Sequence, residues 1–197
     1  MNATDDRPPE ASDPPTEDPR PDGLRVARSL VIVNTGDGKG KSTAAFGIVM
    51  RAIAREWRVA VIQFLKSGEW HTGEEKVAQR LGVDWYARGE GFTWDSTDLS
   101  EDEAVARSAW EQAAAIIRAG EHRLVVLDEI TYPLNWGWLD VDEVLATIRD
   151  RPATVNVVAT GRDAPAALLD VADTVTEMRS IKHAYESGIA AKKGIDY

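Results

Sequence analysis

Residues 30–50 read LVIVNTGDGKGKSTAAFGIVM, which predicts a strand, a glycine-rich turn and a helix in direct succession. The run of Leu30 to Val33 is apolar and β-branched, as is typical of a buried strand. The glycines that follow let the backbone turn with its N–H groups pointing inward. The next helix presents unpaired N–H groups and the positive end of its dipole. This stretch therefore predicts a nest for an anion, and phosphate suits it best.

The turn fits the phosphate-loop pattern G-x-x-x-x-G-K-[ST] imperfectly. Gly40, Lys41 and Ser42 match its end, but residue 35 is threonine and the first glycine falls one place later, at Gly36. In the pattern, the lysine reaches a phosphate as a point charge and the hydroxyl binds magnesium. A glycine turn without a ligand is the alternative interpretation, and the strand before it and the helix after it argue against that. The departure at residue 35 leaves open how the phosphates lie.

From Leu24 onward, short apolar runs alternate with helical patterns, which predicts an α/β domain of three layers with a mostly parallel sheet. Several runs are apolar on both faces, as expected when helices cover both sides of the sheet. Capping patterns begin three of the helices, at Ser100, Asp140 and Asp163. The expected strands are 30–35, 59–65, 83–87, 124–128, 154–160 and 174–178, and the expected helices are 42–55, 73–81, 101–119, 141–149 and 164–171.

Residues 1–23 differ from the rest of the chain in composition. They hold six of the nine prolines, seven acids against two bases, and almost no large apolar side chain. Such a segment cannot bury enough surface to offset its ordering entropy, so we expect a disordered tail, with ordering on a partner as the minority interpretation. The tail also carries half of the formal net charge of -10. The domain is expected to be a single one, over residues 24–197.

The overall balance of residues favours some partners over others. An acidic chain is a poor electrostatic match for nucleic acid. The chain has no cysteine, which excludes disulfides and thiolate metal sites and is compatible with a reducing compartment. No apolar run is long enough for a membrane span or a signal peptide. We therefore expect a cytoplasmic protein that binds neither membrane nor nucleic acid.

The run Leu124-Val125-Val126-Leu127-Asp128-Glu129 is an apolar strand that ends in two acids. In phosphate-loop folds, we expect this strand beside the first one, with its carboxylates facing a magnesium ion (or manganese) held by Ser42. Glu129 could also activate a water molecule. Stabilising a phosphoryl group usually needs a further cation, and spacing alone does not choose among Arg51, Arg55, Arg88, Arg162 and Arg179. These motifs indicate a protein that uses Mg-ATP.

Longer stretches resemble the corrinoid (cob(I)alamin) adenosyltransferases of the ATP-dependent phosphate-loop type, which have a RecA-like fold. The resemblance covers essentially residues 24–197, and GFTW together with the KHA…GIDY terminus is its most specific part. The matching stretches are TGDGKGKSTAAFG (35–47), VAVIQFLKSGEW (59–70), GFTW (91–94), LDEITYPLNWGWL (127–139), ATGRDAP (159–165) and LLDVADTVTEMRSIKHAYESGIAAKKGIDY (168–197).

The resemblance implies a reaction in which the 5′-deoxyadenosyl group of ATP passes to cobalt(I) of a corrinoid such as cob(I)alamin, and triphosphate is released. The loop would then cradle a leaving group, with Lys41 and Lys39 supplying positive charge. The residues implied to bind nucleotide are Gly36, Asp37, Gly38, Lys39, Gly40, Lys41, Ser42 and Thr43. The family commonly has asparagine and threonine where this chain has Asp37 and Ser42, and Asp37 places a negative charge near the triphosphate.

The resemblance also implies residues on the corrinoid side. Phe92 and Trp94 would take the space of the lower cobalt ligand, which makes cobalt(II) easier to reduce. Trp136 lines the corrinoid pocket or serves packing. His183 makes a hydrogen bond or a structural contact rather than ligating cobalt, and Arg162 contacts phosphate at a strand end, where ligands of α/β folds gather.

The family's usual partners are a second copy of the chain, in a homodimer whose N-terminal segment helps to cover the active site, and an electron-donating reductase. Here only residues 24–29 suit that covering role. We therefore expect deletion of residues 1–22 to leave turnover unchanged in a direct comparison with the full chain. A large loss of turnover in the shortened chain would place the tail in the site.

Three other functions fit parts of the sequence. A generic phosphate-loop ATPase or nucleotide kinase would yield orthophosphate or a phosphorylated acceptor. An ATP-regulated corrinoid carrier would bind both ligands without forming a cobalt–carbon bond. A nucleic-acid motor of the RecA type would share the sheet, but the chain lacks a basic stripe.

Overall fold

The computed structural model describes residues 16–17, 20–65, 72–87 and 99–196. Its centre is a 6-stranded sheet in the order β3-β2-β4-β5-β1-β6. Every pairing between these strands is parallel, so the expected parallel sheet is confirmed. The strands are β1 (Val31–Thr35), β2 (Val59–Gln63), β3 (Asp84–Ala87), β4 (Leu124–Asp128), β5 (Asn156–Thr160) and β6 (Thr174–Glu177).

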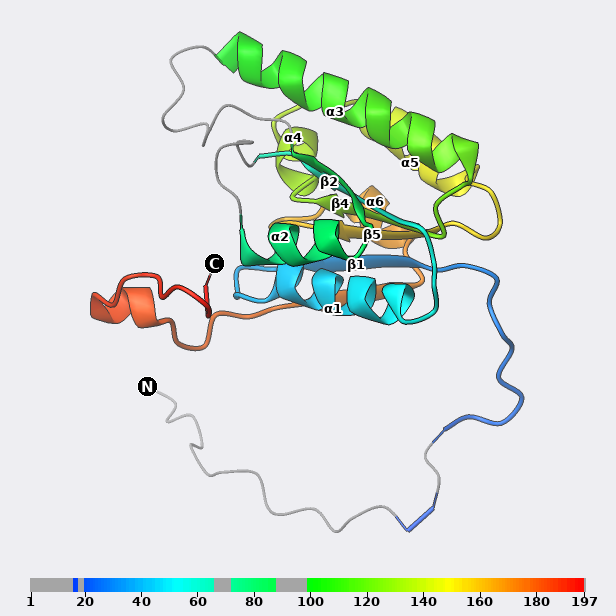
Figure 1. The fold of residues 1–197 in the computed structure, drawn as a ribbon, viewed down its shortest axis with the longest axis horizontal. Coiled ribbons are helices and arrows are strands. Elements are labelled where there is room, and N and C mark those ends of the chain that lie inside the picture. Colours follow the sequence, from blue (N-terminus) through cyan, green and yellow to red (C-terminus); the bar gives the residue numbers. More distant parts are fainter. Residues whose placement is uncertain (1–15, 18–19, 66–71, 88–98, 197) are drawn as a thin grey trace, which may run out of the picture.

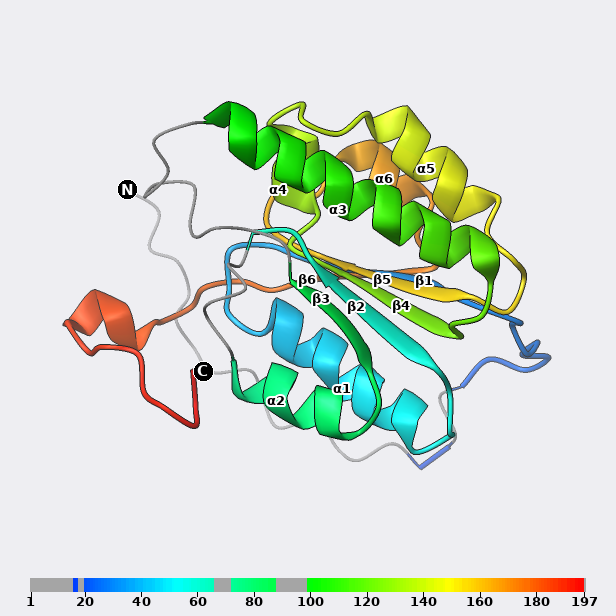
Figure 2. The same cartoon turned by 45° about the horizontal axis from the view of Figure 1, so that its top comes forward.

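Helices cover both faces of the sheet, which makes the three layers that the sequence predicts (Figures 1 and 2). Within the described part of the chain, two helices lie on one face and four on the other. The first pair is α1 (Lys41–Ile53) and α2 (Gly73–Arg80); the second set is α3 (Leu99–Ala119), α4 (Thr131–Asn135), α5 (Val141–Arg149) and α6 (Ala166–Asp170). A 3-10 helix, η1 (Ala184–Ser187), follows β6.

The core is divided by the sheet into two apolar clusters. Phe46 and Val49 of α1 pack against one face, and Trp110 and Ile117 of α3 pack against the other. All five residues of β2 and of β4 are buried, because helices cover both of their faces. That burial on both faces is why the sequence shows continuous apolar runs there instead of alternation.

The sequence predicts that the strand ending in Asp128 lies beside the first strand, and this prediction is wrong. β5 lies between them and pairs with β1 on one side and with β4 on the other. The inserted strand ends in Thr160, whose hydroxyl donates to the carboxylate of Asp128 at the end of β4 and accepts from the backbone N–H of Glu129. β5 therefore separates β1 from β4 and adds hydrogen bonds at the end of β4.

Two of the three predicted caps were wrong. Asp140 caps α5, and its side chain accepts hydrogen bonds from the backbone N–H groups of residues 142 and 143. Ser100, however, lies inside α3, which begins at Leu99. α6 begins after Pro165 with no side-chain cap, so Asp163 does not start it. The sequence also gave no warning of α4 or η1, which are only one or two turns long.

Among the described residues, no helix has both the length and the apolar character needed to cross a membrane.

Candidate active site

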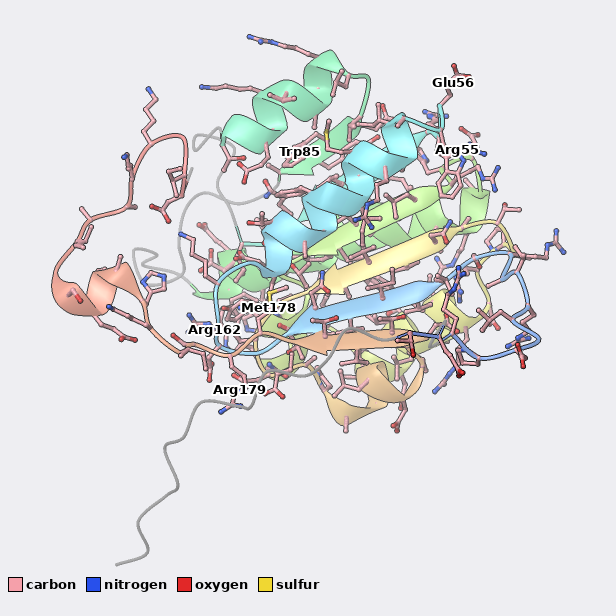
Figure 3. The ribbon with its side chains drawn as sticks, turned by 90° about the horizontal axis from the view of Figure 1, so that it is seen from below. Arg55, Glu56, Trp85, Arg162, Met178 and Arg179 are labelled. Atoms are coloured by element: carbon pink, nitrogen blue, oxygen red, sulfur yellow. The ribbon has the colours of Figure 1, made fainter. Side chains whose placement is uncertain are left out.

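The glycine turn runs between β1 and α1 and is pressed against the segment that follows β6. Gly38 N donates a hydrogen bond to Met178 O at 2.6 Å. Gly36 has a φ of 92°, and a Cβ there would lie 2.8 Å from Met178 N and closer still to Met178 O. Only glycine fits such a close approach with this backbone conformation. Figure 3 shows Met178 beside the turn, at the same end of the sheet as Arg162.

The same geometry explains why residue 35 is threonine. Thr35 is the last residue of β1 and pairs with Glu177 of β6. Its carbonyl accepts from Met178 N at 2.8 Å, and its hydroxyl accepts from Ala164 N at 3.1 Å. The first glycine falls at residue 36 because residue 35 still belongs to the strand. Thr35 thereby ties the turn to the segment that carries Arg162.

The N-terminus of α1 is open to a ligand. Gly40 occupies the cap position with a φ of 115°, and no side chain caps the first turn. No acidic residue lies in that turn. The first-turn N–H groups of Lys41, Ser42 and Thr43 therefore keep their capacity to bind an anion.

Lys41 is folded into the turn. Its Nζ donates to Gly36 O at 2.7 Å and to Gly38 O at 2.8 Å. Burial is the main cause that lowers its pKa below the ordinary value of a lysine, and the nearby Arg162 guanidinium lowers it further. The charges of Asp37, Glu129 and Asp163 act in the opposite direction. The site thus holds two cations for a polyanion and carboxylates that can share a metal ion with it.

Asp128, the last residue of β4, and Glu129, which follows it, differ in their surroundings. Asp128 is fully buried: its Oδ2 accepts from Gln63 Nε2 at 3.0 Å and its Oδ1 accepts from Thr160 Oγ1 at 2.8 Å. Gln63 Oε1 in turn accepts from Trp85 Nε1 at 3.2 Å. This chain of hydrogen bonds links β3, β2, β4 and β5. Asp128 therefore links the ends of three neighbouring strands, and its predicted contact with magnesium stays a prediction.

Glu129 reaches the site by leaving the strand in a left-handed conformation, with a φ of 65°. Its N–H donates to Thr160 Oγ1 at 2.9 Å, which holds the turn. A positive φ at a residue with a side chain is strained and is often found at functional sites. Glu129 and Ser42 line one cavity. Magnesium takes few protein oxygens and completes its shell with water and phosphate oxygens, so these two groups fit it.

That cavity measures about 310 Å³ and brings together most of the predicted nucleotide-binding residues. Of the five candidate arginines, Arg162 lies in its wall, because it follows β5 directly. Arg55 lies at the opposite end of α1 (Figure 3). The cavity is lined by Asp37, Gly38, Lys39, Gly40, Lys41, Ser42, Thr43, Glu74, Glu129, Tyr132, Arg162, His183 and Asp196.

His183 lies in the cavity wall at the start of η1. Its Nδ1 accepts a hydrogen bond from Tyr185 N at 3.1 Å. That His183 serves as a hydrogen-bonding or structural residue stays a prediction.

Trp136 does not line the phosphate cavity. It is 43% exposed and packs between Tyr132, at 5.6 Å between ring centroids, and Trp138, at 4.6 Å. Tyr132 itself lines the cavity, and burial followed by the charge of Glu129 raises its pKa. The three rings form an aromatic cluster beside the site. Phe92 and Trp94, like Arg88, lie outside the described residues.

Sequence reasoning missed three residues of the cavity wall: Glu74, Tyr132 and Asp196. Glu74 lies in the first turn of α2, and Tyr132 lies in α4, which the sequence did not predict. Gln63 and Thr160 were also missed, although a polar residue at the end of an apolar strand is a usable signal.

A second, mainly apolar groove of about 520 Å³ adjoins the cavity and shares Thr43 and Glu74 with it. Its walls come from α1 and α2, with Trp85 of β3 at one side and Ile195 at the other.

The fold and the loop define an α/β protein of the phosphate-loop class. The flagellar accessory protein FlaH from Methanocaldococcus jannaschii has the same fold: the two structures match with a TM-score of 0.51 at 11% identity, over 77% of this chain and 71% of FlaH. Residues 27–197 match the family described as ATP:corrinoid adenosyltransferase BtuR/CobO/CobP, and the chain belongs to that family. It is a transferase that moves the adenosyl group of ATP to a corrinoid in cobalamin biosynthesis.

Characterised relatives support this assignment over nearly the whole domain. The corrinoid adenosyltransferase of Pseudomonas aeruginosa is 45% identical over 175 residues, which is 88% of this chain and 86% of the relative. That of Escherichia coli K12 is 40% identical over 170 residues, or 86% of each chain. Corrinoid adenosyltransferase CobA of Salmonella typhimurium is 39% identical over 170 residues, again 86% of each chain.

Proposed function

We propose that the chain aligns cobalt(I) of a corrinoid with C5′ of ATP and binds the triphosphate that leaves. A cobalt–carbon bond forms, the C5′–O bond breaks, and the electron pair of that bond departs with the triphosphate. Cobalt(I) is itself a strong nucleophile, so no side-chain nucleophile is needed. This proposal rests on the cavity in which Lys41, Arg162 and an uncapped helix N-terminus converge.

In this reaction the residues of the cavity act on the leaving group. Lys41, Lys39 and Arg162 offset the negative charge that grows on the triphosphate, and the N–H groups of α1 bind its oxygens. Ser42 and Glu129 would hold magnesium or, alternatively, manganese, which would supply further positive charge for the leaving group. Asp128 fixes the strand ends from which Glu129 projects. The site's main task is therefore to align the reacting atoms and stabilise charge.

On the corrinoid side, we propose that the aromatic cluster of Tyr132, Trp136 and Trp138 forms part of the wall. Its exposed edge at Trp136 lies next to the cavity, so a flat apolar macrocycle can pack there. Phe92 and Trp94 would exclude the lower axial ligand and so favour reduction of cobalt. An electron-donating reductase would supply that electron.

We also propose a homodimer that works in the cytoplasm, where ATP is available. Large apolar side chains are exposed at both ends of the domain, at Leu24, Val26, Val175 and Ile181. β6 forms an edge of the sheet, and all four of its residues are exposed. A second copy of the chain would cover such surface.

Asp37→Asn is expected to lower the Michaelis constant for ATP by roughly two- to fivefold. Asp37 is exposed in the cavity wall, and its charge acts on Lys41. Its carboxylate therefore repels a triphosphate that Lys41 attracts. Steady-state kinetics with saturating corrinoid would measure the effect, with Asp150→Asn, in an exposed turn, as the control. An unchanged or higher constant would count against this role.

Polyphosphate binding is expected to take up a proton at alkaline pH. In the free protein the pKa of Lys41 is lowered, mainly by burial, so the amine loses its proton at a lower pH than an ordinary lysine. A bound polyanion favours the charged form and raises that pKa. Between the two pKa values, binding adds a proton, and affinity falls as pH rises through this window. Calorimetry in buffers of different ionisation enthalpy would measure the uptake.

The control for this experiment is Lys41→Met, which removes the titrating amine. Uptake that is identical in the two proteins would show that another group binds the proton. Release of a proton by the unchanged protein would contradict the sign of the linkage.

The bond that breaks in ATP tests the proposed reaction. ATP labelled with ¹⁸O at the oxygen that bridges C5′ and the α-phosphorus is incubated with reduced corrinoid, magnesium and the protein. Attack at C5′ leaves the label in inorganic triphosphate, which mass spectrometry detects. Label retained in ADP or AMP would show cleavage at phosphorus and would favour a phosphate-loop ATPase instead.

A further inference from the structure

The end of the chain forms a separate feature of the site, which we call the C-terminal strap and define as residues 183–196. After β6 the chain passes the glycine turn at Met178 and extends away from the body. It turns through η1 and comes back, so that its end lies near the start of α1, as the orange-to-red segment of Figure 1 shows. The strap thus begins and ends at the phosphate cavity, at His183 and Asp196.

The end of the strap contacts the glycine turn through an ion pair. Asp196 Oδ1 accepts from Lys39 Nζ in an ion pair. The other carboxylate oxygen accepts from Lys192 N at 2.7 Å, and Asp196 N donates to Lys192 O at 2.8 Å. The carboxylate is therefore oriented by a tight local turn. It lies on a lysine of the loop, where a phosphate oxygen of the nucleotide would otherwise bind.

Burial of apolar side chains contributes little to the stability of the contact between the strap and the site. Its large apolar side chains stay exposed: Tyr185 is 77%, Ile189 is 58% and Ile195 is 75% exposed. The Lys39 side chain is itself half exposed, at 51%. The Asp196 side chain is less exposed, at 21%, but an ion pair with one solvent-accessible partner still exchanges with a competing anion. A triphosphate carries several charges, so it competes strongly for the same lysine.

We propose that the C-terminal strap is a gate on the phosphate cavity in which Asp196 and triphosphate compete for Lys39. Without polyphosphate, the carboxylate neutralises Lys39 and the strap lies closed. Polyphosphate takes over Lys39 and frees the strap. After transfer, the returning carboxylate helps triphosphate to leave. This inference rests on the proposed function, since it assumes that the cavity holds triphosphate.

The first test measures binding of inorganic triphosphate by calorimetry in the full chain. Asp196→Asn is expected to tighten binding by roughly three- to fivefold, the size of an exposed ion pair that no longer competes. The matched control is Glu186→Gln, which removes the same charge from an exposed residue of η1 outside the cavity wall. It is expected to change the dissociation constant by less than about twofold.

A double-mutant cycle then separates a specific pair from a general charge effect. In a Lys39→Met background, the gain from Asp196→Asn is expected to disappear. A gain that persists without Lys39 would overturn the exchange at that lysine. Equal effects of Asp196→Asn and Glu186→Gln would overturn the gate as well and leave the transferase function standing.

A second readout follows the strap itself. Trypsin can cleave after Lys192 and Lys193, which are both exposed in the turn that Asp196 closes. Saturating triphosphate is expected to speed this cleavage severalfold, and Asp196→Asn is expected to be cleaved at the fast rate without ligand. Intact mass would report both rates. Slower cleavage with triphosphate would show that the ligand closes the strap, which overturns the proposal. Absence of triphosphate binding in every variant would overturn both the gate and the phosphate site.

Discussion

Lys41→Met is expected to lower kcat/KM for ATP by about 10³-fold, the loss seen when a principal charge-stabilising donor is removed from an active site. Lys41 lies between the glycine turn and Arg162, and its Nζ donates to two carbonyls of the turn. It is thus oriented before the ligand arrives. Because it acts on charge that grows as C5′–O breaks, kcat should fall along with the affinity for ATP.

The matched control is Lys76→Met. Lys76 is exposed on α2 and lies outside the cavity wall, so this variant should keep full activity. Anaerobic assays with chemically reduced cobalamin would measure both variants without dependence on a reductase. If Lys41→Met kept kcat and raised only KM, Lys41 would bind the ground state alone, and its role in stabilising the leaving group would be wrong.

Gly36→Ala is expected to lower the free energy of unfolding by about 2–4 kcal/mol and to abolish detectable ATP binding. A methyl group at residue 36 would press into the backbone of Met178, and the φ of 92° disfavours any side chain. The neighbour is backbone at the end of β6, so it cannot move aside cheaply. The turn must then open, and its anion-binding N–H groups lose their alignment.

Gly47→Ala provides the control for the same chemical change. Gly47 lies inside α1, and a Cβ there would meet nothing within 4 Å. Replacing glycine by alanine within a helix stabilises it by about 0.5–1 kcal/mol. Thermal or denaturant unfolding should therefore shift in opposite directions for the two variants. Equal stability of Gly36→Ala and the unchanged chain would mean that the turn and β6 are less tightly apposed than described.

The sequence predicted the layers and most elements because the physical signals are local. β2 and β4 are apolar up to their last residues, Gln63 and Asp128, because both faces are covered. The Asp140 side chain caps α5 by accepting from backbone N–H groups two and three residues further on. The glycine turn was found because glycines, lysine and hydroxyl are contiguous in the sequence. The order of the strands was harder, because the insertion of β5 between β1 and β4 depends on pairing over long range.

The rest of the site is assembled from distant segments, and sequence reasoning could not place them without the resemblance. Asp196 meets Lys39 across 157 positions, and Thr160 meets Asp128 across 32. No periodicity encodes either contact. The roles of Asp128 and Glu129 could not be separated either, because the φ of Glu129 and the two partners of Asp128 decide which carboxylate faces the cavity.

One anaerobic measurement tests directly whether the loop holds triphosphate as a leaving group. Reduced cob(I)alamin, Mg-ATP and the protein are mixed, the loss of cobalt(I) absorbance is followed, and the phosphate product is identified. We expect a light-sensitive adenosylated corrinoid and inorganic triphosphate in equal amounts. Orthophosphate without a cobalt–carbon product would contradict this account.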